Sequence, residues 1–64
     1  MNRIIYNETW EARTKDNNYY TIIHVRYEEK EILNGRLEIA RKSIADMHNV
    51  KLIKMLDRQK ETRF

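Results

Sequence analysis

The spacing of apolar residues changes once along this chain, near Asn34-Gly35, and this change limits the folds open to it. Before that point apolar side chains alternate with polar ones, which is the period of a β-strand. From Gly35 to Arg63 they recur at intervals of three and four residues, which is the period of a helix. We therefore expect an α+β domain, with an N-terminal antiparallel β-hairpin packed on one or two C-terminal helices.

The N-terminal half predicts two strands joined by a short turn. The first strand covers about residues 3–13, and Glu8 interrupts an otherwise apolar face made of Ile4, Tyr6, Trp10 and Ala12. The second covers about residues 19–33, and its expected core face carries Tyr19, Thr21, Ile23, Val25 and Tyr27. Residues 15–18 favour a turn, because Asp and Asn tolerate left-handed backbone.

Asn34-Gly35 allows two interpretations. In the first, it forms a two-residue hairpin turn, which requires positive φ at both residues, and a short third strand follows. In the second, the preceding strand continues to Leu33, and the two residues form a loop before a helix that begins at Arg36. We favour the loop, because helical spacing starts directly after it, at Leu37, Ala40, Ile44 and Met47.

The helical region, about residues 36–62, contains a phase shift at His48-Asn49. Continuing the first apolar stripe would place Lys51 near its centre. The apolar positions that follow lie roughly 110° away on the helical wheel, at Leu52, Ile53, Met55 and Leu56. Either one helix carries two apolar faces, or a break at His48-Asn49 separates two shorter helices, with Asn as a cap residue. The sequence is compatible with both.

Residues 44–58 loosely resemble a helix-turn-helix, in which a small residue packs between helices and Gly or Asn forms the turn. Ala45, Asn49 and Val50 have suitable spacings. His48, however, occupies a position that is usually apolar, and no further helix is expected ahead of Gly35. No family is inferred from this resemblance.

Basic residues in the second half mark a candidate binding surface. Lys51, Lys54 and Arg58 share one face if this segment is helical, and such a face could neutralise phosphates. A solvated helix face is the simpler explanation of the same pattern. Two further cations, Arg41 and Lys42, could extend this surface, together with Arg63 near the C-terminal end of the segment.

The hairpin is the second candidate surface, because it is rich in aromatic residues. Tyr20 points away from the expected core face of its strand, whereas Trp10 and Tyr27 are expected to fill the core. An exposed aromatic group beside Arg13, Lys15 or Arg26 could stack on unpaired bases. It could equally anchor a protein interface, where Tyr, Trp and Arg contribute strongly to binding.

The chain carries no recognisable catalytic or metal-binding motif. His24 and His48 are the only groups that ordinarily titrate near neutral pH, and neither lies in a motif with a nucleophile or a carboxylate. Without cysteine, two histidines do not make a zinc site. We therefore expect a non-enzymatic protein with no cofactor and no metal.

Sixty-four residues form one small domain, residues 1–64, with no disulfide to stabilise it. Self-association, as a homodimer, or an obligate partner would supply the missing stability. The mean hydropathy of −0.90 argues against a membrane role. We expect a cytoplasmic protein, since no apolar N-terminal segment resembles a signal peptide.

The charge balance permits nucleic acid as a partner without requiring it. Thirteen Lys and Arg oppose ten Asp and Glu, a net charge of +3. We expect a small regulatory protein that acts on a nucleic-acid-handling system by direct DNA or RNA binding through a basic helix face. The alternative is an inhibitor or adaptor of the kind that phages and mobile elements encode, which would bind and block a host protein.

Overall fold

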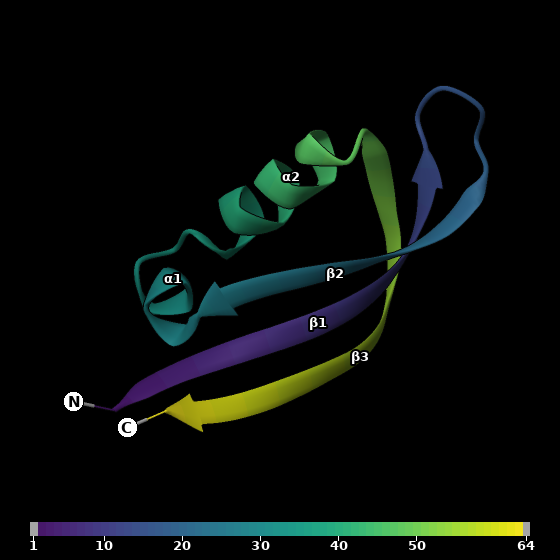
Figure 1. Cartoon of the computed structure of the whole chain (residues 1–64). Helices are drawn as coiled ribbons and strands as arrows, with labels where there is room; N and C mark the ends of the chain where they lie inside the picture. Colours follow the sequence, from purple (N-terminus) through teal and green to yellow (C-terminus); the bar gives the residue numbers. More distant parts are fainter. Residues whose placement is uncertain (1, 64) are drawn as a thin grey trace.

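A computed structural model describes residues 2–63 as a three-stranded antiparallel sheet with two helices on one side (Figure 1). In chain order the elements are β1 (Arg3–Thr14), β2 (Tyr20–Glu28), α1 (Glu29–Leu33), α2 (Leu37–Met47) and β3 (Val50–Arg63). The predicted α+β class is confirmed. The C-terminal element, however, is a long strand and not a helix.

The strand order is β2-β1-β3, so the first strand lies at the centre of the sheet. Both neighbours run antiparallel to β1, and β2 and β3 are therefore parallel to each other. The segment that contains α2 crosses over β1 between these two outer strands (Figure 1). The topology is thus a β-α-β crossover with an antiparallel strand inserted at its middle.

The turn between β1 and β2 lies where Asp and Asn cluster in the sequence. Asn18 has a φ of 56°, in the left-handed region that Asn tolerates better than most residues. Its N–H donates to the carbonyl of Thr14 over 2.9 Å, and the Thr14 hydroxyl accepts from the N–H of Tyr19 over 3.0 Å. These contacts close the turn locally.

The second strand ends earlier than predicted, at Glu28, and α1 takes the place of its expected continuation to Leu33. Gly35 has a φ of 70°, whereas Asn34 has a φ of −90°. A two-residue hairpin turn needs positive φ at both positions, so the alternative third strand at this point is wrong. A loop instead leads into α2, as the favoured interpretation had it.

The chain does break at His48-Asn49, but the second helix predicted after the break is wrong. Asn49 has a φ of 54°, which ends α2, and the N–H of His48 donates to the carbonyl of Ile44 over 3.1 Å. The chain then enters β3, which pairs with β1 along its whole length. The resemblance to a helix-turn-helix fails for the same reason.

Two irregularities in β3 explain why its sequence mimics a helix. The register against β1 skips Ile53 and Leu56, so each is an extra residue of the bulge type. Because the extra residues are three apart, positions on one face recur every third residue along this stretch, and not every second. One face therefore receives Lys51, Lys54 and Asp57, and the other receives Leu52, Met55 and Arg58. A period of three lies close to that of a helix.

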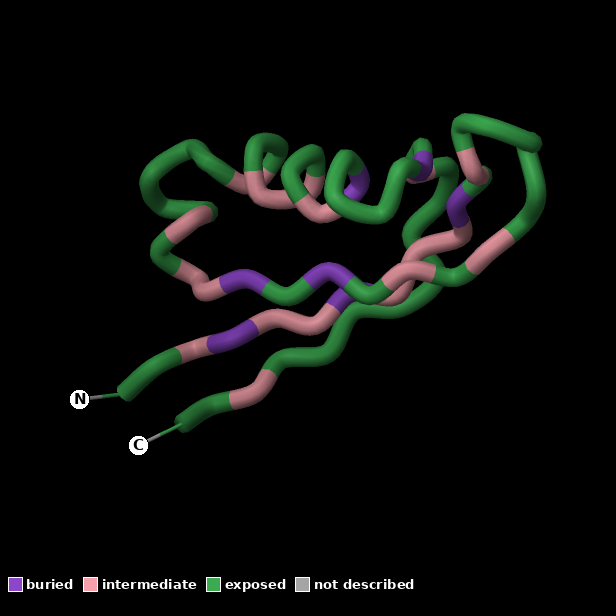
Figure 2. The backbone as a smooth tube through the Cα atoms, turned by 45° about the horizontal axis from the view of Figure 1, so that its top comes forward, coloured by how far each residue is buried: buried purple, intermediate pink, exposed green. Residues whose placement is uncertain are grey.

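The core is small. Its main cluster lies between α2 and the end of the sheet at the β1–β2 turn, which we call the hairpin end, and further buried residues follow along β1 and β2 (Figure 2). Its centre is Ala12, Ala45 and Val50, against which Ile23 and Leu52 pack. In β2 the alternation predicted from the sequence is confirmed: Val25 and Tyr27 are buried, whereas His24 and Arg26 are exposed. Both Trp10 and Tyr19 were predicted to be core residues. Trp10 is only partly buried, and Tyr19 is exposed and does not belong to the core.

The helices cover only part of one sheet face. An 11-residue helix such as α2 is about 16 Å long, whereas the molecule extends 43 × 20 × 15 Å. Both helices lie on the same side (Figures 1 and 2). Within residues 2–63, no element covers the opposite side, which we call the open face.

Candidate nucleic-acid interface

The pairing register arranges the open face in rows that run across the three strands. Residues directly opposite each other in an antiparallel pair point to the same side of the sheet. The row at the hairpin end is Tyr20, Arg13 and Lys51, and the next is Ile22, Glu11 and Lys54. Lys51, Lys54 and Tyr20 of the predicted binding set therefore lie together, although they come from opposite edges of the sheet.

A surface hollow lies at the same end of the sheet. Three of its lining residues are cationic and one is apolar: Arg13, Lys15, Lys51 and Ile53. Thr14 and Asn18 from the turn add polar groups to its wall. The hollow thus combines positive charge, hydrogen-bonding groups and a small apolar patch.

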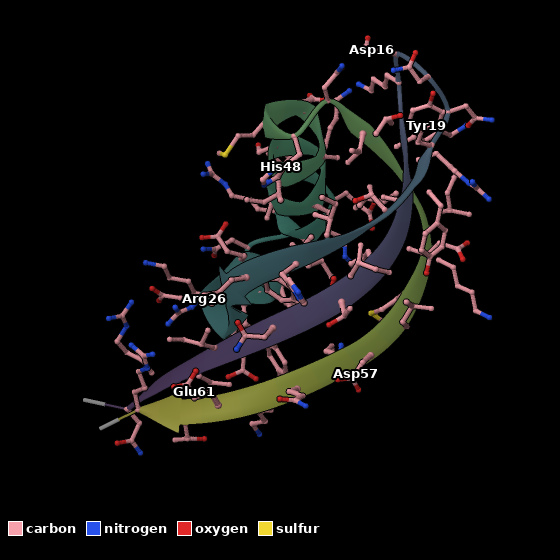
Figure 3. All side chains as sticks on the ribbon, turned by 45° about the vertical axis from the view of Figure 1, so that its right-hand side comes forward. Asp16, Tyr19, Arg26, His48, Asp57 and Glu61 are labelled. Atoms are coloured by element: carbon pink, nitrogen blue, oxygen red, sulfur yellow. The ribbon has the colours of Figure 1, made fainter. Side chains whose placement is uncertain are left out.

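Tyr20 is held beside the central cation of this row. The guanidinium of Arg13 lies over the Tyr20 ring at 5.5 Å from its centroid, a cation–π contact. Tyr20 remains 53% exposed. Tyr19 is 68% exposed and lies in the turn, outside the paired rows (Figure 3). The exposed contact expected for Tyr20 is thus sterically available.

The cations of this end differ in how they are paired. Lys15 makes an ion pair with Asp46 over 3.3 Å. Arg13, Lys51 and Lys54 make no ion pair with any other residue that the structure describes. Glu11 lies directly opposite Lys54 and offsets part of its charge. Arg13, Lys51 and Lys54 are therefore the charges available to a ligand.

The far end of the open face has the opposite character. Its row is Glu28, Ile5 and Glu61, and Glu61 is seen near the chain termini in Figure 3. A hydrogen bond from Arg3 lowers the pKa of Glu28, and one from Arg63 lowers the pKa of Glu61. These carboxylates are ionised and carry their own cations. An anionic ligand would therefore favour the hairpin end.

Three residues of the predicted binding set lie elsewhere. Arg58 is on the helix side of β3, with its guanidinium 4.9 Å from the centroid of the Tyr6 ring. Arg41 projects from α2 toward Glu8, and Lys42 is exposed on α2. The single face predicted for Lys51, Lys54 and Arg58 is wrong, because the bulges in β3 divide these residues between the two sides of the sheet.

Arg41 forms an ion pair with the buried carboxylate of Glu8. Glu8 is 0% exposed and accepts hydrogen bonds from Arg41 Nε over 2.9 Å and Arg41 Nη2 over 2.7 Å. Trp10 Nε1 donates to it over 2.8 Å, and the Tyr27 hydroxyl donates to its second oxygen. Burial raises the pKa of Glu8, but these donors outweigh burial and the pKa is lowered.

One sign of this cluster is visible in the sequence, since Glu8 is the charged residue that interrupts an apolar strand face. The sequence contains no sign of which cation would reach Glu8, because Arg41 is 33 residues away in the chain. The hollow was also missed. Thr14, Asn18 and Ile53 meet there only through the turn and the bulge.

The histidines lie apart from each other. His24 is on the open face, with Nδ1 3.4 Å from the Thr9 hydroxyl, and His48 is exposed at the end of α2 (Figure 3). Within residues 2–63 no three His, Cys, Asp or Glu side chains gather as a metal site would require. Neither helix in the described part of the chain has the length and apolarity to cross a membrane.

Comparison of the chain with protein families, with curated proteins and with solved structures finds no match.

Proposed function

We propose that this protein is a non-catalytic regulatory binder that contacts nucleic acid directly, through the hairpin end of its open face. One observation carries the proposal: Arg13, Lys51 and Lys54 lie in adjacent rows of the open face without ion-pair partners in the described chain, and the first two line the hollow. Lys and Arg that neutralise phosphates release counterions, and this release supplies most of the affinity of sequence-independent binding. The binding surface is a sheet face in place of the helix face expected from the sequence.

The size of the salt effect follows from the number of cations. Each phosphate contact contributes about −0.9 for duplex DNA, or about −0.7 for a single strand, to the slope of log affinity against log salt. Three contacts predict a fall in affinity of about 20- to 40-fold between 50 and 200 mM salt. Fluorescence anisotropy with labelled single-stranded and duplex oligonucleotides, DNA and RNA, measures this fall.

A matched pair of triple variants tests the location. Arg13→Gln, Lys51→Gln and Lys54→Gln together remove three charges from the hairpin end of the open face. The control, Arg36→Gln, Lys42→Gln and Lys60→Gln, removes three exposed charges from elsewhere. We expect at least a tenfold loss of affinity in the first and less than a threefold loss in the second. Equal losses, or no binding by the wild type at 50 mM salt, would refute the proposal.

A second candidate, a protein inhibitor or adaptor, is favoured by the exposed edge of β3. This strand borders the sheet over 14 residues and exposes Ile53, Met55 and Leu56. An unpaired strand edge can accept a strand from a partner, with apolar residues adding affinity. Replacing Met55 and Leu56, which lie outside the hollow, by Ser should then abolish a stoichiometric protein complex while leaving oligonucleotide binding unchanged. An intact complex would exclude this edge.

A further inference from the structure

We propose that the ligand of this surface is single-stranded nucleic acid, with a base stacked on Tyr20 and the phosphates along Lys51 and Lys54. The inference rests on the proposed function and specifies its ligand. Three observations support it: the width of the sheet, the separation of aromatic and cationic residues, and the position of Arg13 between them.

The width of the sheet disfavours a groove of duplex DNA. The axes of β2 and β3 are about 10 Å apart, since each strand adds about 4.8 Å. The molecule as a whole extends 43 × 20 × 15 Å. The major groove is about 12 Å wide and admits one helix or two strands. A three-stranded face is too broad to enter it, and both helices lie on the other side.

At the hairpin end of the open face, the aromatic ring of Tyr20 lies at one edge and the cations Lys51 and Lys54 lie at the other. Tyr20 and Ile22 belong to β2, whereas Lys51 and Lys54 belong to β3, with β1 between them. A single strand has its phosphates on one side of the sugars and its bases on the other. Such a strand can lay its phosphates against β3 while its bases extend over β1 toward β2. In a duplex the base faces are already stacked and cannot reach Tyr20.

Arg13 connects the two edges. It lies opposite both Tyr20 and Lys51, and its guanidinium packs on the Tyr20 ring. This contact holds the Tyr20 ring in place, and the exposed part of the ring leaves surface on which a base can stack. The plane of an Arg side chain is itself a stacking surface for bases. Ile22, two residues along β2, gives the next base an apolar neighbour.

The experiment compares a 12-nucleotide oligonucleotide of mixed sequence, as DNA and as RNA, with the 12-base-pair DNA duplex, at 50 mM salt. We expect the single strands to bind at least tenfold more tightly than the duplex. Removing a stacked aromatic side chain costs at least fivefold in affinity. Tyr20→Leu should therefore lose about fivefold or more on single strands, while Tyr20→Phe keeps wild-type affinity. Tyr19→Leu is the matched control, because Tyr19 lies outside the rows, and it should change affinity less than twofold.

The outcomes separate the two proposals. Equal, salt-sensitive binding of single strands and duplex, with no effect of Tyr20→Leu, would overturn this inference and leave the proposed function intact. No binding to any of the three oligonucleotides would overturn both. Circular dichroism of each variant verifies the fold, which an exposed side chain such as Tyr20 should not alter. A difference between DNA and RNA of the same sequence would identify which sugar is preferred.

Discussion

Replacing Arg41 by Met should destabilise the protein by leaving the Glu8 carboxylate without its cation. Glu8 is fully buried and receives two of its four hydrogen bonds from Arg41. Met preserves an apolar side chain over the Trp10 ring, where the guanidinium now lies 5.2 Å from the centroid. The substitution therefore removes the charge and the donors with little loss of packing.

The size of the expected stability loss follows from the burial of both side chains, Glu8 and Arg41. Removing one partner of a buried ion pair costs about 3–5 kcal/mol, because the other charge stays buried. The Arg41 side chain is 16% exposed, so we expect the lower end, about 3 kcal/mol. A domain of this size has a total stability of roughly 3–10 kcal/mol. The melting temperature should fall by about 12–24 °C.

A double-mutant cycle with Glu8→Gln isolates the pair, with unfolding followed by circular dichroism in urea. In the wild-type background Glu8→Gln should destabilise, because it weakens the contacts with Arg41. In the Arg41→Met background the same change should stabilise, by about 2 kcal/mol, because it removes an uncompensated charge. Lys42→Met is the control on the same helix and should change stability by less than about 0.5 kcal/mol.

The reversal of sign is the decisive result. If Glu8→Gln has the same effect in both backgrounds, the two side chains are not energetically coupled and the account of the buried pair is wrong. A loss below about 1 kcal/mol for Arg41→Met would show that water or a rearranged side chain compensates Glu8.

Three further outcomes follow. The pKa of Glu8 is lowered in the folded state, so its stabilising contribution is complete above the unfolded pKa of about 4.3 and is lost as pH falls through the folded pKa. Acidification from pH 6 to pH 3 should therefore reduce the free energy of unfolding more in the wild type than in Arg41→Met. Equal pH dependence of this free energy in the two proteins would contradict the prediction. Asn49→Ala should destabilise by about 1 kcal/mol more than Asn49→Gly, as thermal melts would show. Both substitutions remove the hydrogen bond that Asn49 Nδ2 donates to Asp16 over 2.9 Å, but only Ala carries a Cβ that is strained at a φ of 54°. Deleting Ile53 should preserve the sheet, because Ile53 is an extra residue with no partner in β1. Deleting Gln59, which is paired, should invert the side-chain directions of the β3 residues on one side of the deletion. Similar melting temperatures for the two deletions would argue against the bulge.

The sequence was most informative where one local rule decides the structure. Residues 3–13 alternate, and β1 spans Arg3–Thr14. Asn49 interrupts the apolar stripe, and α2 ends just before it. In each case the information lies within a few neighbouring residues. Tertiary contacts did not need to override it.

The sequence misled where pairing with a distant strand decides the structure. Beyond Asn49 an apolar spacing of three arises from bulges at Ile53 and Leu56, and no local signal separates this from a helix. The same bulges bring Lys51 and Lys54 onto one face and send Arg58 to the other. Lys51 and Lys54 therefore share a face because of the bulges and not because of helical periodicity.

The central position of β1 has a consequence during synthesis. Arg3 pairs with Arg63, sixty residues later in the chain. At about 5–20 residues per second, some 3–12 s separate the appearance of these partners on the ribosome, whereas a hairpin forms in microseconds. The pair of β1 and β2 can therefore exist for seconds with one edge of β1 bare. During that interval the bare edge of β1 can pair with another strand, until β3 occupies it.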